Sequence, residues 1–140
     1  MQVTLKRVNE NVHFKGIGSA GVEINIDGSP SAGGINAGAR PMELVLMALG
    51  SCSSIDIIQI LKKQRQHISD FVVEVNGERS PDCIPSLFTN INVHYKLKGK
   101  LDEKKVDKAI KLSMEKYCSV TAILNKTANV SYSFEITNEN

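Results

Sequence analysis

The feature that most constrains this chain is a long apolar segment that begins at Pro41. No further proline occurs before His67, and the segment is rich in Leu, Met, Ala and Ile, which predicts a helix of about 25 residues. Residues 44–49 are apolar on every face of such a helix. Because one sheet covers only one side of a helix, we expect a second subunit to cover the other side, as in an obligate dimer. Farther along, a narrower buried stripe is expected to comprise Ile55, Ile58 and Leu61.

The same segment has the length of a membrane span, since residues 42–61 are about as many as a bilayer requires. However, Glu43, Asp56, Gln59 and three serines inside this window would each be costly in lipid. The first fifteen residues lack both an apolar core and a small-residue cleavage site, unlike a secretory signal. We therefore expect no membrane partner and a cytoplasmic location.

Alternating apolar residues predict short strands on both sides of the helix. Three precede it, around residues 3–5, 12–14 and 22–26, and two follow it, at 71–75 and 87–97. In the last of these, the inner face is expected to carry Leu87, Thr89, Ile91, Val93, Tyr95 and Leu97. Residues 28–38 hold four Gly, one Pro and two Ser, which predicts a flexible loop.

The C-terminal part of the chain predicts two helices and a last strand. Asp102 is suited to cap the first helix. Its buried stripe is expected to comprise Val106, Ala109, Ile110, Ser113, Met114 and Tyr117. Cys118 and Ser119 interrupt this helix, residues 120–124 form a short apolar helix, and residues 130–136 alternate as a strand. The predicted fold class is α+β, in the order βββ-α-ββ-α-α-β, with the helices gathered against antiparallel sheet.

Composition narrows the possible functions. A chain of 140 residues with 41% hydrophobic residues fits one domain spanning residues 1–140. Basic residues number 17 and acidic residues 15, with no basic cluster, so no nucleic acid is expected as a partner. The three cysteines form no C-x-x-C pair and the three histidines are scattered, so neither a metal nor another cofactor is expected.

Cys52 and Cys118 are the candidates for chemistry. Cys52 lies in the small-residue run 50–54, which leaves room beside the thiol for another helix or for a substrate. Cys118 lies at the start of the short helix, where N-terminal amides are expected to lower its pKa. Such a pair suits a two-cysteine peroxide reductase, although buried inert cysteines are an alternative at both positions. Cys83, between two prolines in a surface loop, is expected to be a bystander.

Three segments of the chain share a pattern with a known family. They are residues 38–44 (GARPMEL), 47–56 (MALGSCSSID) and 117–120 (YCSV). Together they resemble the OsmC/Ohr family of osmotically inducible and organic hydroperoxide resistance proteins, over essentially the whole chain. The resemblance implies an OsmC-like fold, with antiparallel sheets packed on a long central helix, and a role in the stress response. It also implies an intertwined homodimer with each site at the subunit interface.

The resemblance further implies roles for individual residues. By position, Cys52 would attack the peroxide and Cys118 would resolve the oxidised product. Family members place a Glu directly after the proline that starts the helix, whereas this chain has Met42 there. Its Glu43 is displaced by one residue, which is about 100° of helical rotation.

A second departure concerns the cation that holds the thiolate. Family members use an Arg from the early strand region, but between residues 8 and 39 this chain offers only Lys15. Arg40 is the expected substitute, because its long side chain carries a permanent charge. An Arg40–Glu43 pair is expected to stabilise the Cys52 thiolate by charge. With Arg-Pro-Met-Glu-Leu before the helix, the chain most resembles a less-characterised branch of the family.

These observations predict a thiol-dependent peroxidase, or a related redox protein, that reduces small organic hydroperoxides and is regenerated by an external thiol reductant. A site lined by apolar helix residues rewards an alkyl tail by about 0.8 kcal/mol per buried CH₂. The expected lining comprises Leu44, Met47, Ile55 and Ile58. One alternative is a non-catalytic binding module that holds a small apolar ligand in a dimer-interface cavity. Another is a purely structural dimer.

Overall fold

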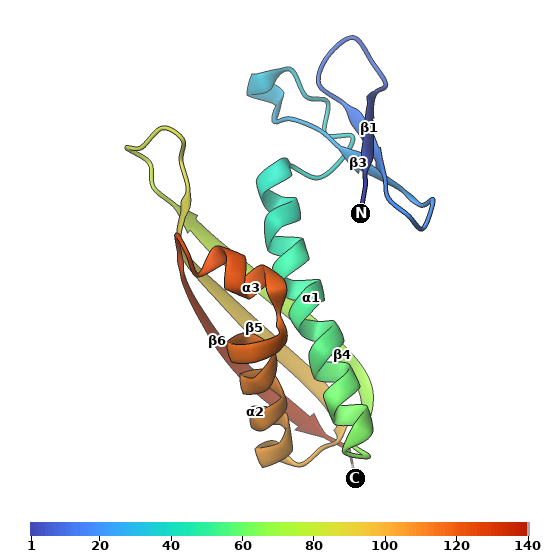
Figure 1. The fold of residues 1–140 in the computed structure, drawn as a ribbon, viewed down its shortest axis with the longest axis vertical. Coiled ribbons are helices and arrows are strands. Elements are labelled where there is room, and N and C mark those ends of the chain that lie inside the picture. Colours follow the sequence, from blue (N-terminus) through green and yellow to red (C-terminus); the bar gives the residue numbers. More distant parts are fainter. Residues whose placement is uncertain (140) are drawn as a thin grey trace. The chain divides into compact units, whose positions relative to one another are not determined.

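The computed structural model describes residues 1–139 and divides into two compact units (Figure 1). Unit 1 spans Met1–Val45, and unit 2 comprises the chain from Leu46 onward. Each unit is described by itself. The prediction that residues 1–140 act as one domain stays a prediction.

Unit 1 contains a three-stranded antiparallel sheet in the order β1-β2-β3. The strands are β1 (Thr4–Arg7), β2 (Phe14–Ile17) and β3 (Glu23–Ile26), which confirms the three predicted strands. Lys15 of β2 pairs with Glu23 of β3 across the sheet, with 3.0 Å between Nζ and Oε2. The strands are short, and most of their side chains are exposed in this chain.

The glycine-rich segment that follows β3 is a loop, as predicted, and its backbone is hydrogen-bonded to one buried side chain. Asp27, which is only 1% exposed, accepts hydrogen bonds from the backbone N–H groups of Gly28, Ile35 and Ala37 at 2.8, 2.9 and 3.0 Å. A short helix, η1 (Pro30–Ala32), lies within the loop. One buried carboxylate thus supplies hydrogen-bond acceptors for backbone N–H groups of a loop that forms no regular secondary structure over most of its length.

Unit 2 contains a second three-stranded sheet, in the order β4-β5-β6. The strands are β4 (His67–Arg79), β5 (Phe88–Lys100) and β6 (Asn129–Asn138). Strand β4 is antiparallel to β5, but β6 is parallel to β5, so the prediction of antiparallel sheet holds only in part. The physical reason is the connection between β5 and β6, which contains helices and crosses over the sheet before β6 begins.

The inner face of β5 also differs at its start from the predicted alternation. Ile91, Val93, Tyr95 and Leu97 are buried as predicted, but Leu87 and Thr89 are exposed and Phe88 is buried instead. The pairing register shifts between Glu78 and Arg79, and Thr89 has no opposite residue there. A bulge of this kind reverses the alternation by one residue.

Helix α1 (Pro41–Lys63) is shorter than predicted. It stops before His67 because Arg65 adopts a left-handed conformation, with φ 56°, and β4 begins at His67. The predicted stripe is also wrong in part, since Leu61 is buried but Ile55 and Ile58 are exposed. A helix that is apolar all round gives no periodicity from which to choose the packed face.

The part of α1 in unit 2 packs on the sheet with a different face. Its buried residues are Leu49, Gly50, Ser53, Ser54, Ile57 and Leu61. A Cβ atom added at Gly50 would lie 3.0 Å from Val75 Cγ2, so this glycine allows close approach to β4. The helix is long and apolar enough to span a membrane, but core helices of globular proteins can be so too, and here Leu49, Ile57 and Leu61 contribute to the core of unit 2.

Helices α2 and α3 complete unit 2 and, with α1, lie on one face of the sheet (Figure 1). Helix α2 (Glu103–Leu112) begins as predicted at Asp102, whose side chain accepts a hydrogen bond from Lys105 N. It continues into the π-helical turn η2 (Ser113–Tyr117), and α3 (Ser119–Leu124) follows. Of the predicted buried stripe, Tyr117 is 51% exposed, because the wider π turn changes the helical phase.

Candidate functional site

Cys52 lies on one side of α1, between the face that packs on the sheet and the exposed face. It is partly exposed. Its serine neighbours donate to helix carbonyls, since Ser51 Oγ bonds Met47 O at 2.7 Å and Ser54 Oγ bonds Gly50 O at 2.6 Å. Their hydroxyls are thereby satisfied without bulk, so the small-residue run leaves the thiol accessible.

Cys118 is held at the junction between η2 and α3. Its backbone N–H donates to Ser113 O at 2.8 Å, which closes the π turn. Its sulfur caps α3 by accepting from Thr121 N at 3.4 Å, as expected for a residue at the start of a helix. The side chain is only 3% exposed, so Cys118 is the buried member of the pair.

The structure brings the two thiols together, although they are far apart in sequence. Burial raises the pKa of the Cys118 thiol, and the nearby Cys52 thiol adds to this through hydrogen bonding and charge. The hydrogen bonds from Thr121 lower this pKa, but by less than burial and Cys52 together raise it. The prediction of a lowered pKa for Cys118 is therefore wrong, because loss of hydration outweighs the helix N-terminus.

A buried polar network lies next to the thiol pair. Tyr95 of β5 donates from its hydroxyl to Ser53 Oγ at 2.6 Å, and its oxygen lies 3.3 Å from Met114 Sδ. Thr121 Oγ1 lies 3.6 Å from the same sulfur. Burial raises the pKa of Tyr95 to about 12, so its hydroxyl stays protonated and continues to donate. The network joins the Cys118 turn to the helix that carries Cys52.

Asp56 is a residue of this region to which sequence reasoning assigned no role. It lies one helical turn after Cys52, and its Oδ2 accepts a hydrogen bond from Ser113 Oγ at 3.0 Å. Ser113 Oγ also lies 3.2 Å from Ser53 O, so this serine fastens η2 to α1. The spacing of four residues from Cys52 was the available signal, since such residues share a helix face.

Arg40 and Glu43 take part in the start of α1, within unit 1. Glu43 Oε2 accepts from the backbone N–H of Arg40 at 2.9 Å, in the manner of a capping box. The Arg40 guanidinium donates to Gly38 O at 3.3 Å and to Asn36 Oδ1. The two side chains therefore do not form the expected ion pair, because Glu43 bonds the main chain instead.

Cys83 is exposed in the segment between β4 and β5, away from any described strand or helix. Within residues 1–139, no group of three or more His, Cys, Asp or Glu side chains is placed to hold a metal ion.

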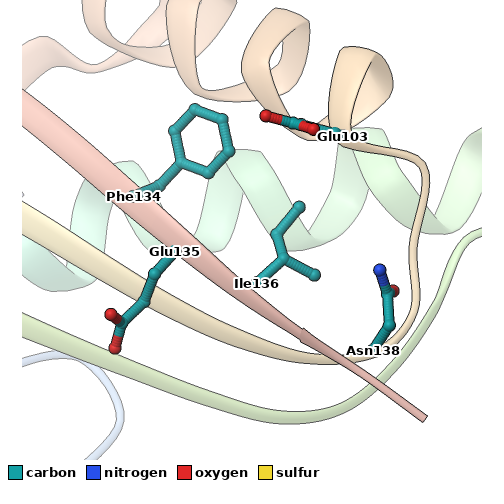
Figure 2. Close-up of a pocket in the computed structure, with 5 residues that line it drawn as sticks. All are labelled: Glu103, Phe134, Glu135, Ile136 and Asn138. Carbon is teal, nitrogen blue, oxygen red and sulfur yellow. The ribbon is translucent and has the colours of Figure 1, made fainter.

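Unit 2 has one cavity next to the thiol pair and another away from it. A groove of about 490 Å³ lies between α1 and the turn η2, one helical turn beyond Cys52. We call it the α1–η2 groove, and its lining includes Asp56, Gln59, Lys63, Gln64, Leu112 and Tyr117. A smaller depression of about 210 Å³ lies between the start of α2 and β6, where Phe134 and Ile136 point toward Glu103 (Figure 2). It lies at the opposite end of α2 from Cys118, so it is separate from the thiol pair.

Comparison with known proteins agrees with this geometry. The family model for OsmC-like proteins matches residues 33–133. Protein YhfA of Escherichia coli K12 is 41% identical over 137 residues, which cover 97% of this chain and 98% of YhfA. A hypothetical protein from Aquifex aeolicus VF5, known from a crystal structure, is 37% identical in sequence and has a TM-score of 0.86. The match covers 99% of this chain and 97% of the Aquifex chain. The organic hydroperoxide resistance protein OhrB of Bacillus subtilis has the same fold, with 20% identity, a TM-score of 0.66 and 96% coverage of both chains.

Proposed function

The chain belongs to the family of OsmC-like proteins, and from that premise we propose that it is a thiol-dependent peroxidase for small organic hydroperoxides. The observation that carries the proposal is the pairing of a partly exposed Cys52 with a buried Cys118 next to it. Relatives with the same fold include proteins named for organic hydroperoxide resistance.

In the first step, the Cys52 thiolate attacks the outer oxygen of the hydroperoxide. The O–O bond breaks, the alkoxide takes a proton and leaves as the alcohol, and Cys52 becomes a sulfenic acid. Cys52 suits this role because it is the more accessible thiol of the pair. The proposal keeps Arg40 and Glu43 as electrostatic helpers of the thiolate, but not through the ion pair that the sequence predicted, because Glu43 bonds the backbone of Arg40.

In the second step, the Cys118 sulfur attacks the sulfenic sulfur of Cys52. A disulfide forms, and the sulfenic oxygen leaves as water with the proton of the Cys118 thiol. The raised pKa of Cys118 suits a resolving thiol, which stays protonated until an oxidised partner is beside it. An external thiol reductant then restores both thiols.

We also propose that the active form is a homodimer in the cytoplasm. The outward face of α1 carries exposed apolar side chains, including Met47, Ile55 and Ile58. Such a face favours a covering partner, because each large apolar side chain gains about 1.5–3 kcal/mol on burial. The same face would give the site its apolar lining and its preference for an alkyl tail.

Peroxide consumption with dithiothreitol as reductant tests the function. We expect tert-butyl hydroperoxide and cumene hydroperoxide to be reduced faster than hydrogen peroxide. Cys52→Ser should abolish the activity, and Cys118→Ser should leave one turnover that stops at a Cys52 sulfenic acid, detectable by dimedone labelling and mass spectrometry. Cys83→Ser is the matched control and should behave as the parent chain does.

Unchanged activity in Cys52→Ser would refute the proposal. Binding of an apolar ligand by a protein that consumes no hydroperoxide would favour the non-catalytic binding module instead.

A further inference from the structure

Ser113 is the first residue of the π turn η2, and it is completely buried. Its side chain and its main chain bond in two different directions. The hydroxyl donates toward α1, where Asp56 Oδ2 lies at 3.0 Å and Ser53 O at 3.2 Å. The carbonyl accepts from the backbone N–H of Cys118 at 2.8 Å. One residue thus bonds both to the helix that carries Cys52 and to Cys118 itself.

The two acceptors of the Ser113 hydroxyl lie close to Cys52 along α1. Ser53 follows Cys52 directly, and Asp56 follows it by one helical turn. A hydroxyl has a single proton, so the two acceptors share it. The carboxylate is the stronger acceptor, because hydrogen bonds to ionised groups are stronger than those between neutral groups. The start of η2 is therefore fixed against the turn of α1 that contains Cys52.

The π turn in its own right determines where Cys118 lies. Cys118 joins η2 to α3 as a single residue with an extended backbone, at φ −71° and ψ 106°. The turn closes through a hydrogen bond between residues five apart, here Ser113 and Cys118. Helix ends fray where such bonds are weak, so the position of Cys118 depends on how firmly Ser113 is held.

Other hydrogen bonds beside the thiol pair connect the two supports less directly. The Cys118 sulfur accepts from Thr121 N at 3.4 Å, but Thr121 belongs to α3, which follows Cys118 in the chain. Tyr95 bonds Ser53 Oγ on α1, and its contact with η2 is to the sulfur of Met114, which is a weak acceptor. The bonds of Ser113 are therefore the most direct connection between the two cysteine supports among the described residues.

We infer that Ser113, assisted by Asp56, is a positioning residue that holds Cys118 where its sulfur can bond Cys52. A disulfide needs Cα atoms within about 7 Å of each other, so a shift of the junction between η2 and α3 separates the sulfurs. Restricting Cys118 beforehand favours the disulfide, because less conformational freedom is lost when the bond forms. This inference rests on the proposed function, since both residues act through the same thiol pair.

The exchange equilibrium between the protein and dithiothreitol measures this positioning. The thiols of Cys52 and Cys118 are oxidised to one disulfide, while oxidised dithiothreitol takes up both electrons and both protons and becomes the dithiol. All variants carry Cys83→Ser, so that one disulfide can form within the chain. Alkylation with iodoacetamide and mass spectrometry then give the fractions of reduced and oxidised protein over a range of dithiothreitol ratios.

We expect Ser113→Ala to lower the equilibrium constant for disulfide formation about three- to tenfold, the usual effect of losing one hydrogen bond. Asp56→Ala should lower it about two- to threefold, because Ser53 O still accepts from the hydroxyl. Asp56→Asn keeps an acceptor oxygen and should stay close to the parent value. Ser51→Ala is the matched control, since that hydroxyl bonds carbonyls of its own helix, and it should leave the constant unchanged.

A purely structural role for Ser113 predicts a different result. Its loss would lower the stability of the reduced and of the oxidised protein equally, so the equilibrium constant with dithiothreitol would not change. Urea unfolding of both forms of Ser113→Ala tests the same point independently. We expect the oxidised form to lose more stability than the reduced form, because only the oxidised form requires Cys118 to stay in place.

An unchanged equilibrium constant in Ser113→Ala, or an equal change in Ser51→Ala, would overturn the inference. If Ser113→Ala does not fold, Asp56→Ala decides it by the same measurement, because that side chain is only partly buried. The proposed function stands without the inference if the parent chain still forms the disulfide and reduces hydroperoxides. A parent chain that forms no Cys52–Cys118 disulfide would refute both the inference and the two-cysteine mechanism.

Discussion

The two units of the chain differ in the kind of side chain that they bury. In unit 2, helices and sheet enclose a core that includes Leu49, Ile57, Tyr95, Leu97 and Ile110. In unit 1, the only buried residue is Asp27, which is charged and holds its loop through backbone hydrogen bonds. The apolar side chains of unit 1 are instead exposed in this chain, among them Val3, Leu5, Val22 and Ile24.

This difference shows which unit has an apolar core made from its own residues. Unit 2 holds the buried Cys118 and the partly exposed Cys52 beside a core made from its own residues. Unit 1 has a sheet whose apolar side chains lie in solvent, which is unfavourable unless another surface covers them. We therefore expect unit 1 to depend on assembly for its stability and unit 2 to depend mainly on its internal packing, although the outward face of α1 also favours a covering partner.

The largest expected effect is the difference in stability lost when Leu is replaced by Ala in unit 2 and in unit 1. Leu97→Ala in unit 2, where the side chain is 2% exposed, should lower the free energy of unfolding by about 2–5 kcal/mol. Leu5→Ala in unit 1, at 53% exposure, should lower it by no more than about 0.5 kcal/mol in dilute protein. Urea unfolding at low protein concentration measures both, and equal losses would contradict the comparison.

A charge placed on the exposed face of unit 1 should weaken assembly. Ile24→Lys is expected to raise the dissociation constant of the dimer at least about tenfold, because an unpaired charge would be buried there. Glu23→Gln lies on the opposite face of β3, changes the net charge by the same amount and removes only an exposed ion pair, so it is the control. Sedimentation velocity gives both constants, and no change in Ile24→Lys would remove unit 1 from the interface.

A smaller effect is expected from the polar network of unit 2. Tyr95→Phe removes the hydroxyl that bonds Ser53 and should lower the free energy of unfolding by about 1 kcal/mol. It should also slow disulfide formation between Cys52 and Cys118, because the network joins their two supports. Tyr132→Phe, on the neighbouring strand, is the control. If disulfide formation is as fast in Tyr95→Phe as in the control, the network has no part in bringing the thiols together.

The smallest effects are expected from pH, and they have opposite signs in the two units. Hydrogen bonds from the backbone of Ala37 and Ile35 lower the pKa of Asp27, so its stabilisation of the loop is present above the ordinary carboxyl pKa and is lost as the pH falls below it. Burial raises the pKa of Cys118, so its contribution is present below the ordinary thiol pKa and is lost as the pH rises above it.

These pH effects are measured separately. The amide proton shifts of Ile35 and Ala37 should move toward random-coil values in acid, whereas denaturant unfolding should show a loss of stability in base that Cys118→Ala removes. Loss of the Asp27 hydrogen bonds in base, or an alkaline loss that persists in Cys118→Ala, would contradict the assignments.

Much of the fold was predictable because it depends on local patterns. The alternation in residues 22–26 and 130–136 predicted β3 and β6, and Asp102 predicted the start of α2. Cys118 was also placed correctly, since the apolar pattern breaks at that residue and resumes after it. The mixed sheet was missed because strand direction depends on the path of the connection, which a strand pattern does not contain.

The candidate site was predictable in its thiols but not in their surroundings. The resemblance implied the pair, and the structure places Cys52 and Cys118 near each other. Asp56, Lys63 and Gln64 were not predicted as a groove, because its other wall is η2, about fifty residues later in the chain. The capping role of Glu43 was missed because the same side chain suited an ion pair with Arg40 equally well.

The sequence by itself determined the order of helices and strands and the start of α2, because periodicity and capping act over a few neighbouring residues. Only the tertiary structure decided which face of α1 is buried, that β6 runs parallel to β5, and that the pKa of Cys118 is raised. The buried face and the raised pKa depend on hydration lost to residues far away in the chain, and the direction of β6 depends on the path of its connection, so all three are known only once the chain has folded.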